Sequence, residues 1–122
     1  MRTHGEDNFA NDGARDYRAM LATQLVATIK AVMANPSRLE LDEDGESLLM
    51  PSVEILALLC ERTGAAPPKP ARVREWAEKY LAVYDDAIDD ANPSEEFKTG
   101  RRKVIENTFH WLGSLADSYW TR

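Results

Sequence analysis

Apolar residues in this chain recur at steps of three and four, and breaks rich in proline and glycine divide them into four long segments. Such steps place apolar side chains on one face of an α-helix, whereas a half-buried strand alternates every second residue. No stretch with the strand period and no internal repeat is present. The sequence therefore predicts an all-α fold, a small bundle of about four main helices that follows an ordered N-terminal arm over residues 1–10.

The first helix is predicted to run from Asn11 to the pair Asn35-Pro36. The Asn11 side chain suits an N-cap, because its oxygen can accept a hydrogen bond from an amide of the first turn. Asp12 and Asp16 place negative charge near the positive end of the helix dipole. The helix ends at Asn35 because the residue before a proline avoids the helical region.

The start of the second helix is open between two alternatives. It begins at Asp42, with acidic residues in its first turn, or near Ser47. In a helix that starts before Ser47, Pro51 removes a backbone hydrogen bond and causes a kink. In a helix that starts near Met50, Pro51 lies in the first turn, where proline is tolerated. Gly64 is the predicted end.

Two more helices are expected in the second half of the chain. Residues 65–70 contain three prolines and predict a stiff, extended connector. The third helix is predicted over 71–91, and Asn92-Pro93 ends it. Ser94 starts a short helical turn, with a break at Gly100 left open, before a fourth long helix.

Composition narrows the class of protein. A length of 122 residues suits a single domain over 1–122. The net charge of −6 disfavours nucleic acid and anionic membrane surfaces as partners, and the only basic run is Arg101-Arg102-Lys103. With no apolar leader after Met1 and no apolar stretch of about 20 residues, a cytoplasmic location is expected. The single cysteine, Cys60, has apolar neighbours and is predicted to be a buried, inert thiol.

The sharpest electrostatic anomaly is an acidic run that contains Asp85, Asp86, Asp89 and Asp90. These like charges repel at i,i+4 spacing and lie at a helix C-terminus, where the dipole also disfavours acids. In the preferred interpretation, the equally misplaced basic run 101–103 neutralises them across the helical hairpin. In the alternative, the acidic face binds a cation or a basic partner.

Three further features are candidates for a site. Glu106 and His110 share a helix face, but the second Glu-x-x-His of a di-metal bundle is missing, so a salt bridge or a hydrogen-bonded histidine is preferred. Segment 42–46 lacks the ligand register of a calcium loop and is predicted to be a solvated acidic turn. Tyr119 and Trp120 point to different sides of a helix, so either one ring anchors a partner or dimer mate, or the C-terminus frays.

The N-terminal segment carries a distinctive series of residues, namely Gly5, Phe9, Asn11, Asp12, Ala14, Asp16 and Tyr17. This series resembles the opening of a bacterial family known as domain of unknown function 4259, and a weaker likeness continues at residues 39–42 and 94–97. His4 stands where that family usually has tryptophan. The family has no assigned activity, so the resemblance implies a bacterial protein and no catalytic residue.

The arm itself has two interpretations. In the structural one, Phe9 packs on the first helix near Tyr17 and folds the arm back. In the functional one, polar residues converge beside the arm, namely His4, Asp7, Asn11, Asp12 and Asp16.

No glycine-rich phosphate loop, nucleophile elbow or zinc-binding spacing is present in the sequence. No catalytic residue, cofactor or metal ligand is therefore assigned. The leading hypothesis is a non-enzymatic interaction or regulatory module that binds another protein, with a homodimer as one form. The alternative is a metal-binding protein or hydrolase with an acidic site at residues 85–90 or at the N-terminal arm.

Overall fold

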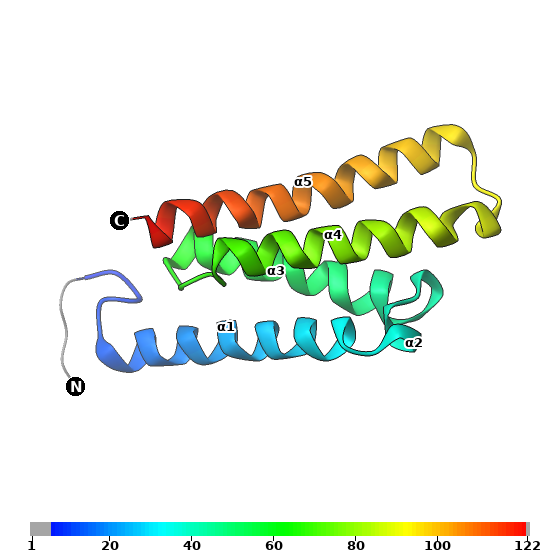
Figure 1. The fold of residues 1–122 in the computed structure, drawn as a ribbon. Helices are drawn as coiled ribbons and strands as arrows, with labels where there is room; N and C mark the ends of the chain where they lie inside the picture. Colours follow the sequence, from blue (N-terminus) through cyan, green and yellow to red (C-terminus); the bar gives the residue numbers. More distant parts are fainter. Residues whose placement is uncertain (1–5, 122) are drawn as a thin grey trace.

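The computed structural model describes residues 6–121, and no strand occurs among them. Its helices are α1 (Asp12–Met33), α2 (Pro36–Leu39), α3 (Met50–Thr63), α4 (Pro70–Ala87) and α5 (Glu95–Trp120). In Figure 1, α1 and α4 run in one direction along the bundle, and α3 and α5 run in the opposite direction. The predicted all-α bundle is confirmed. None of the helices within the described range is long and apolar enough to cross a membrane.

The first helix begins where the sequence predicts. Asn11 is extended, with φ −126° and ψ 155°, and its side-chain oxygen accepts from the amide of Ala14 at 2.8 Å. The helix ends near Asn35, as expected, but the one-turn helix α2 follows at once. The Asn35 side chain caps this turn, and Pro36 occupies its first position, where no amide hydrogen is needed.

The segment before α3 settles the position of Pro51. Residues Leu41–Leu49 form a wide, irregular helical segment in which Glu43 has the non-helical angles φ −112° and ψ −133°. The regular helix starts at Met50, so Pro51 lies in its first turn, the second of the two predicted alternatives. At the other end of α3, Gly64 has a φ of 78°, the left-handed conformation that favours glycine at a helix C-cap.

The predicted third helix is too long. The α-helix ends at Ala87 and tightens into a 3₁₀ turn over Ile88–Ala91. Asn92 then adopts a φ of 52°, which reverses the chain towards α5. Because the acidic run spans this change of helix type, Asp85 and Asp86 lie on regular helix and Asp89 and Asp90 lie on the tighter turn.

The fourth helix is longer than predicted, because the helical turn at Ser94 and the last helix are continuous. The hydroxyl oxygen of Ser94 caps it by accepting from the amide of Phe97 at 3.1 Å. Gly100 does not break it and has open space where a Cβ atom would lie. A glycine inside a helix costs about 1 kcal/mol, which the packing of α5 along α4 and α3 can offset.

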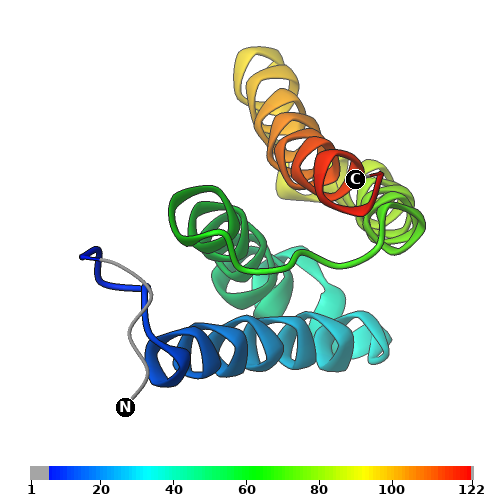
Figure 2. The same ribbon diagram turned by 90° about the vertical axis from the view of Figure 1, so that its left-hand side faces the viewer.

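Figure 2 looks roughly along α3, α4 and α5, with α1 lying across the view. The buried apolar side chains form one core cluster to which all four long helices contribute. Its largest fully buried side chains come from every long helix and include Ile29, Leu56, Tyr80, Tyr84 and Leu112. Cys60 is buried in the same cluster, so the predicted buried thiol is confirmed. Burial raises the pKa of this thiol to about 11, because a thiolate loses solvation there.

Candidate functional site

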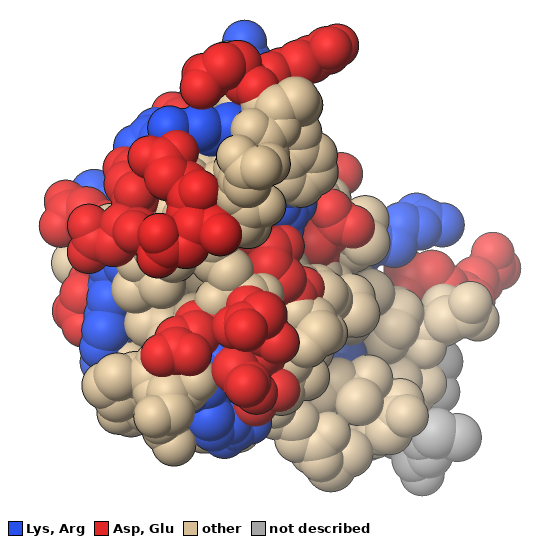
Figure 3. Space-filling view, turned by 90° about the vertical axis from the view of Figure 1, so that its right-hand side faces the viewer, with Lys and Arg blue, Asp and Glu red and all other residues tan. Residues whose placement is uncertain are grey.

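The acidic end of the bundle, defined here as the α4–α5 hairpin from Asp85 to Phe97, is the most distinctive surface of the molecule. This stretch contains six acidic residues and no lysine or arginine. Figure 3 shows acidic side chains gathered on the corresponding end of the molecule. The local folding explains the gathering, because the turn at Asn92 brings the end of α4 and the start of α5 together.

Two of the four predicted acids are paired. The Arg102 guanidinium donates to both carboxylate oxygens of Asp85 at 2.9 Å and also to Glu106 at 2.5 Å. The Lys98 ammonium lies 2.7 Å from Asp89. Hydrogen bonding from Arg102 holds the pKa of Asp85 below its usual value. Arg102 thus neutralises the hairpin in the way the basic run predicts, whereas Lys98 is an additional partner.

The other two acids are not neutralised. Asp86 and Asp90 are exposed and have no hydrogen-bond or ion-pair partner among residues 6–121. Arg101 does not form an ion pair with either of them, because its guanidinium pairs with Glu46 instead. Lys103 is exposed and likewise makes no ion pair within this range. The predicted compensation by the 101–103 run is therefore correct for Arg102 and wrong for its two neighbours.

The same hairpin carries an exposed aromatic ring. Phe97, in the first turn of α5, keeps 56% of its surface exposed. It adjoins Lys98, whose ammonium contacts Asp89 on the other side of the hairpin. The sequence reasoning missed Phe97 as a candidate. The sequence does offer a signal that Phe97 is exposed. It precedes the buried apolar residues of α5, the first of which is Ile105, by about two helical turns.

A polar cluster beneath this surface fixes the elements that carry it. Glu46 pairs with Arg101 and accepts from the Tyr80 hydroxyl at 3.3 Å, while the Tyr84 hydroxyl donates to the carbonyl of Lys98 at 2.8 Å. Burial raises the pKa of both tyrosines, and the negative charge of Glu46 raises it further. Both hydroxyls therefore remain protonated donors, and they tie the 41–49 segment and the start of α5 to α4.

The acidic turn 42–46 has structural partners rather than a calcium-binding register. Asp44 lies 2.7 Å from Arg38, and Glu46 belongs to the half-buried polar cluster with Arg101 and Tyr80. Glu106 and His110 line a groove of about 520 Å³ between α4 and α5, where Glu106 pairs with Arg102 and His110 is exposed. Within the described range, no group of three or more His, Cys, Asp or Glu side chains could hold a metal ion.

The C-terminal aromatic pair is packed against the connector between α3 and α4. The Trp120 indole donates to the carbonyl of Pro67 at 3.0 Å, and the Lys69 ammonium lies 4.1 Å from the centre of the ring. The Tyr119 ring meets Trp120 edge-on, with centroids 5.0 Å apart. Because α5 stays helical to Trp120, the expected fraying is wrong, although Trp120 keeps 41% of its surface exposed, as that alternative also expected. The role of one ring as a partner anchor stays a prediction.

The arm folds back, but not onto the expected residue. Tyr17 is 57% exposed, and the ring of Phe9 instead lies beneath the Arg18 guanidinium, at 5.7 Å from its carbon. The carbonyl of Phe9 accepts from Arg15 at 3.0 Å. Arginines of α1 therefore fix the described part of the arm, which the sequence reasoning did not anticipate.

The polar site predicted beside the arm has a different composition. His4 lies outside the described residues, Asn11 is the helix cap, Asp12 is half-buried in the first turn of α1, and Asp16 is exposed. A cavity of about 560 Å³ does lie beside the arm, but of the predicted group only Asp7 lines it.

Comparisons of the chain with models of known families, with curated proteins and with solved structures find no match. The likeness of the N-terminal segment to domain of unknown function 4259 therefore stays a prediction from the sequence. The chemistry of the surface remains as the guide to function, and it is richest at the acidic end.

Proposed function

We propose that the protein is an interaction module that binds a basic segment of another protein at its acidic end. The observation that carries this proposal is the exposed ring of Phe97 on the same hairpin as the unpaired carboxylates of Asp86 and Asp90. Interfaces typically have an aromatic anchor that is buried on binding, surrounded by a polar rim. Here the ring is the anchor and the carboxylates are the rim.

Electrostatics favour a cationic partner. Asp86 and Asp90 lie four residues apart, and their like charges repel each other with no cation among the described residues to offset them. They also lie near the negative end of the α4 dipole. A lysine or arginine of a partner relieves both penalties, and complementary charge speeds the encounter.

The same charges argue against a second copy of this chain as the occupant. A two-fold dimer brings identical patches together, so the acidic end would face another acidic end. Like charges juxtaposed across an interface cost several kcal/mol. The partner at this surface is therefore a different protein, and the hydrolase or metal-binding alternative has no observation in its favour among the described side chains.

Binding of fluorescent peptides rich in lysine and arginine, each with one large aliphatic residue, tests the proposal. We expect anisotropy to report saturable binding that weakens as salt rises, because surface charges are screened. Phe97→Ala should weaken it by about tenfold or more, the cost of losing an aromatic anchor. The matched control is Met20→Ala, which removes a similarly exposed side chain from α1.

A charge series sharpens the test. Asp86→Asn with Asp90→Asn should lower the association rate and the salt dependence, whereas Asp16→Asn on α1 should change neither. Circular dichroism would verify that each variant is folded. Equal binding by the wild type, Phe97→Ala and the double variant would refute the proposal.

A further inference from the structure

Three arginines converge on the cavity of about 560 Å³ beside the arm. Arg15 and Arg18 reach it from the start of α1, and Arg62 reaches it from the last turn of α3. From this arrangement we propose that the cavity is a binding site for a small phosphate-type dianion. Guanidinium groups suit such a ligand, because their planar set of N–H donors matches phosphate oxygens.

Two of the arginines are held in place before any ligand arrives. Arg15 uses its Nε–H to bind the carbonyl of Phe9, and Arg18 uses one terminal nitrogen to bind the carbonyl of Thr63. The ring of Phe9 also lies beneath Arg18. A guanidinium has five N–H donors, so each arginine keeps others for a ligand. Such preorganisation lowers the entropy that binding must overcome.

The third arginine has no comparable structural role. Arg18 satisfies a carbonyl at the end of α3, and Arg15 secures the arm, so both are accounted for by folding. Arg62 is exposed and has no hydrogen-bond or ion-pair partner in the described part of the chain. Arg15 and Arg18 already spend one donor each on a backbone carbonyl, whereas the Arg62 side chain spends none within the described chain. Arg62 is therefore the arginine with the most N–H donors left for a ligand.

The net charge of the residues that line the cavity favours a dianion. The lining residues include the three arginines and one carboxylate, Asp7, which leaves two net positive charges in a chain of net charge −6. One oxygen of Asp7 already accepts from the amide of Phe9 at 2.9 Å. The C-terminal dipole of α3 contributes about −0.5 of a charge nearby. The remaining net charge of about +1.5 elementary charges suits the two negative charges of phosphate better than the single negative charge of a simple carboxylate.

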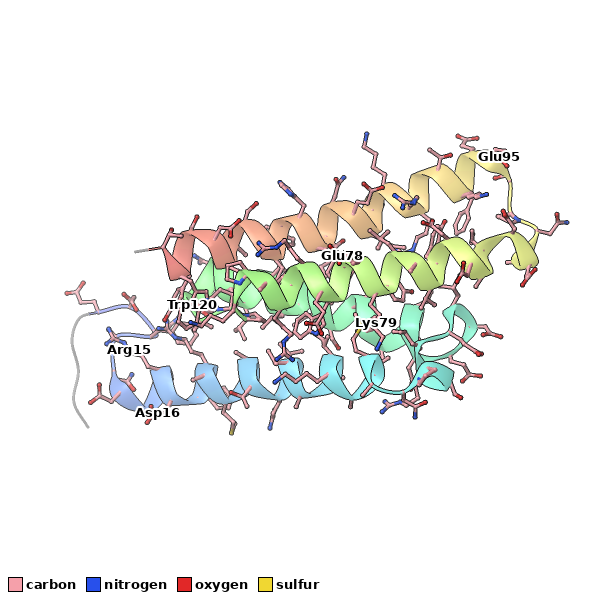
Figure 4. The ribbon with its side chains drawn as sticks, viewed as in Figure 1. Arg15, Asp16, Glu78, Lys79, Glu95 and Trp120 are labelled. Carbon is pink, nitrogen blue, oxygen red and sulfur yellow. The ribbon has the colours of Figure 1, made fainter. Side chains whose placement is uncertain are left out.

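This site is independent of the proposed function. Figure 4 shows Arg15 near one end of the bundle and Glu95, at the start of α5, near the other. Loss of phosphate binding would therefore leave binding of a basic peptide at the acidic end intact, and the converse also holds.

Isothermal titration with inorganic phosphate, at constant ionic strength set by chloride, tests the inference. We expect saturable heat, and Arg62→Gln should weaken phosphate binding by about tenfold or more, since hydrogen bonds to charged groups are the strong ones. Because the Arg62 side chain makes no hydrogen bond or ion pair within the described chain, this variant should fold normally. Arg72→Gln, an exposed change on α4 away from the cavity, should shift affinity by less than about twofold.

Acetate separates the charge classes, because it carries one charge and should bind more weakly than phosphate. Three results would overturn the inference. These are no saturable heat with the wild type, an equal loss in Arg62→Gln and Arg72→Gln, or acetate binding as tight as phosphate binding.

Discussion

Gly45 has the least room for a side chain of the glycines that the structure describes, and its replacement by alanine tests the packing of the 41–49 segment. A Cβ atom at this position would lie 2.5 Å from the carbonyl oxygen of Leu39 and 2.9 Å from that of Glu40. It would also lie 3.1 Å from the buried ring of Tyr80. Two of these neighbours are backbone atoms, which cannot turn aside as a flexible side chain can.

The expected magnitude follows from two opposed effects. Where the backbone tolerates it, Gly→Ala stabilises a protein by about 0.4–1 kcal/mol, because the unfolded chain loses freedom. Overpacking a tight site costs about 1–3 kcal/mol, and contacts with rigid carbonyl groups lie towards the upper part of that range. We therefore expect Gly45→Ala to lower the free energy of unfolding by about 2 kcal/mol, a large fraction of the usual 5–15 kcal/mol.

Urea unfolding followed by far-ultraviolet circular dichroism provides the measurement, and Gly100→Ala provides the matched control. Gly100 lies inside α5, and apart from the backbone of its own helix no atom of the described chain lies within 4 Å of an added Cβ, so its replacement should raise stability by about 0.5–1 kcal/mol. The two variants make the same chemical change and should shift the midpoint in opposite directions with little change in slope. If Gly45→Ala were as stable as the wild type or more so, the steric reasoning would be refuted.

Three other outcomes are expected. Tyr84→Phe should lower the free energy of unfolding by about 1 kcal/mol in the same urea assay, since the carbonyl of Lys98 loses its donor. The Cys60 thiol should react slowly with a disulfide reagent at pH 8 until the protein unfolds, because burial raises its pKa to about 11. The neutral thiol favours the folded state, so the free energy of unfolding should be unaffected by this group below the pKa of the unfolded thiol. It should fall as the pH rises from that pKa towards 11. Arg102 lowers the pKa of Asp85, so the ionised carboxylate stabilises the folded state at every pH above the pKa that Asp85 has in the unfolded chain. This stabilisation is lost as the pH falls through the lower pKa of the folded state. The free energy of unfolding should therefore fall less steeply with acid in Asp85→Asn than in the wild type.

The helices were predictable because their signals are local. The Asn11 cap, the stop at Asn35 and the left-handed end at Gly64 each follow from a single residue's backbone chemistry. The continuity of α5 through Gly100 could not be predicted in this way. The cost of about 1 kcal/mol for a glycine inside a helix is local, but it competes with packing along the whole helix, which the sequence does not display. The position of Pro51 was open for a similar reason, since the irregular segment before it is fixed by contacts distant in the sequence.

The candidate site was predictable in its charge but not in its pairing. Six acids near one hairpin can be counted in the sequence, but the cations that reach them depend on how α5 is rotated about its axis. Lys98 and Arg102 are spaced i,i+4 and therefore share the face turned towards α4, whereas Arg101 is turned towards Glu46. The spacing alone could have suggested the first two as a pair.

The pairing divides one acidic run into two groups with separable roles. Asp85 and Asp89 are spaced i,i+4 and meet Arg102 and Lys98, so they hold the hairpin together. Asp86 is rotated by about 100° on the helix from Asp85, and it has no partner among the described residues. Neutralising Asp85 should therefore change stability first, and neutralising Asp86 should change association with a basic partner first. If either substitution altered both properties equally, the hairpin and the binding surface would be one network, and the acids could not be assigned separate roles.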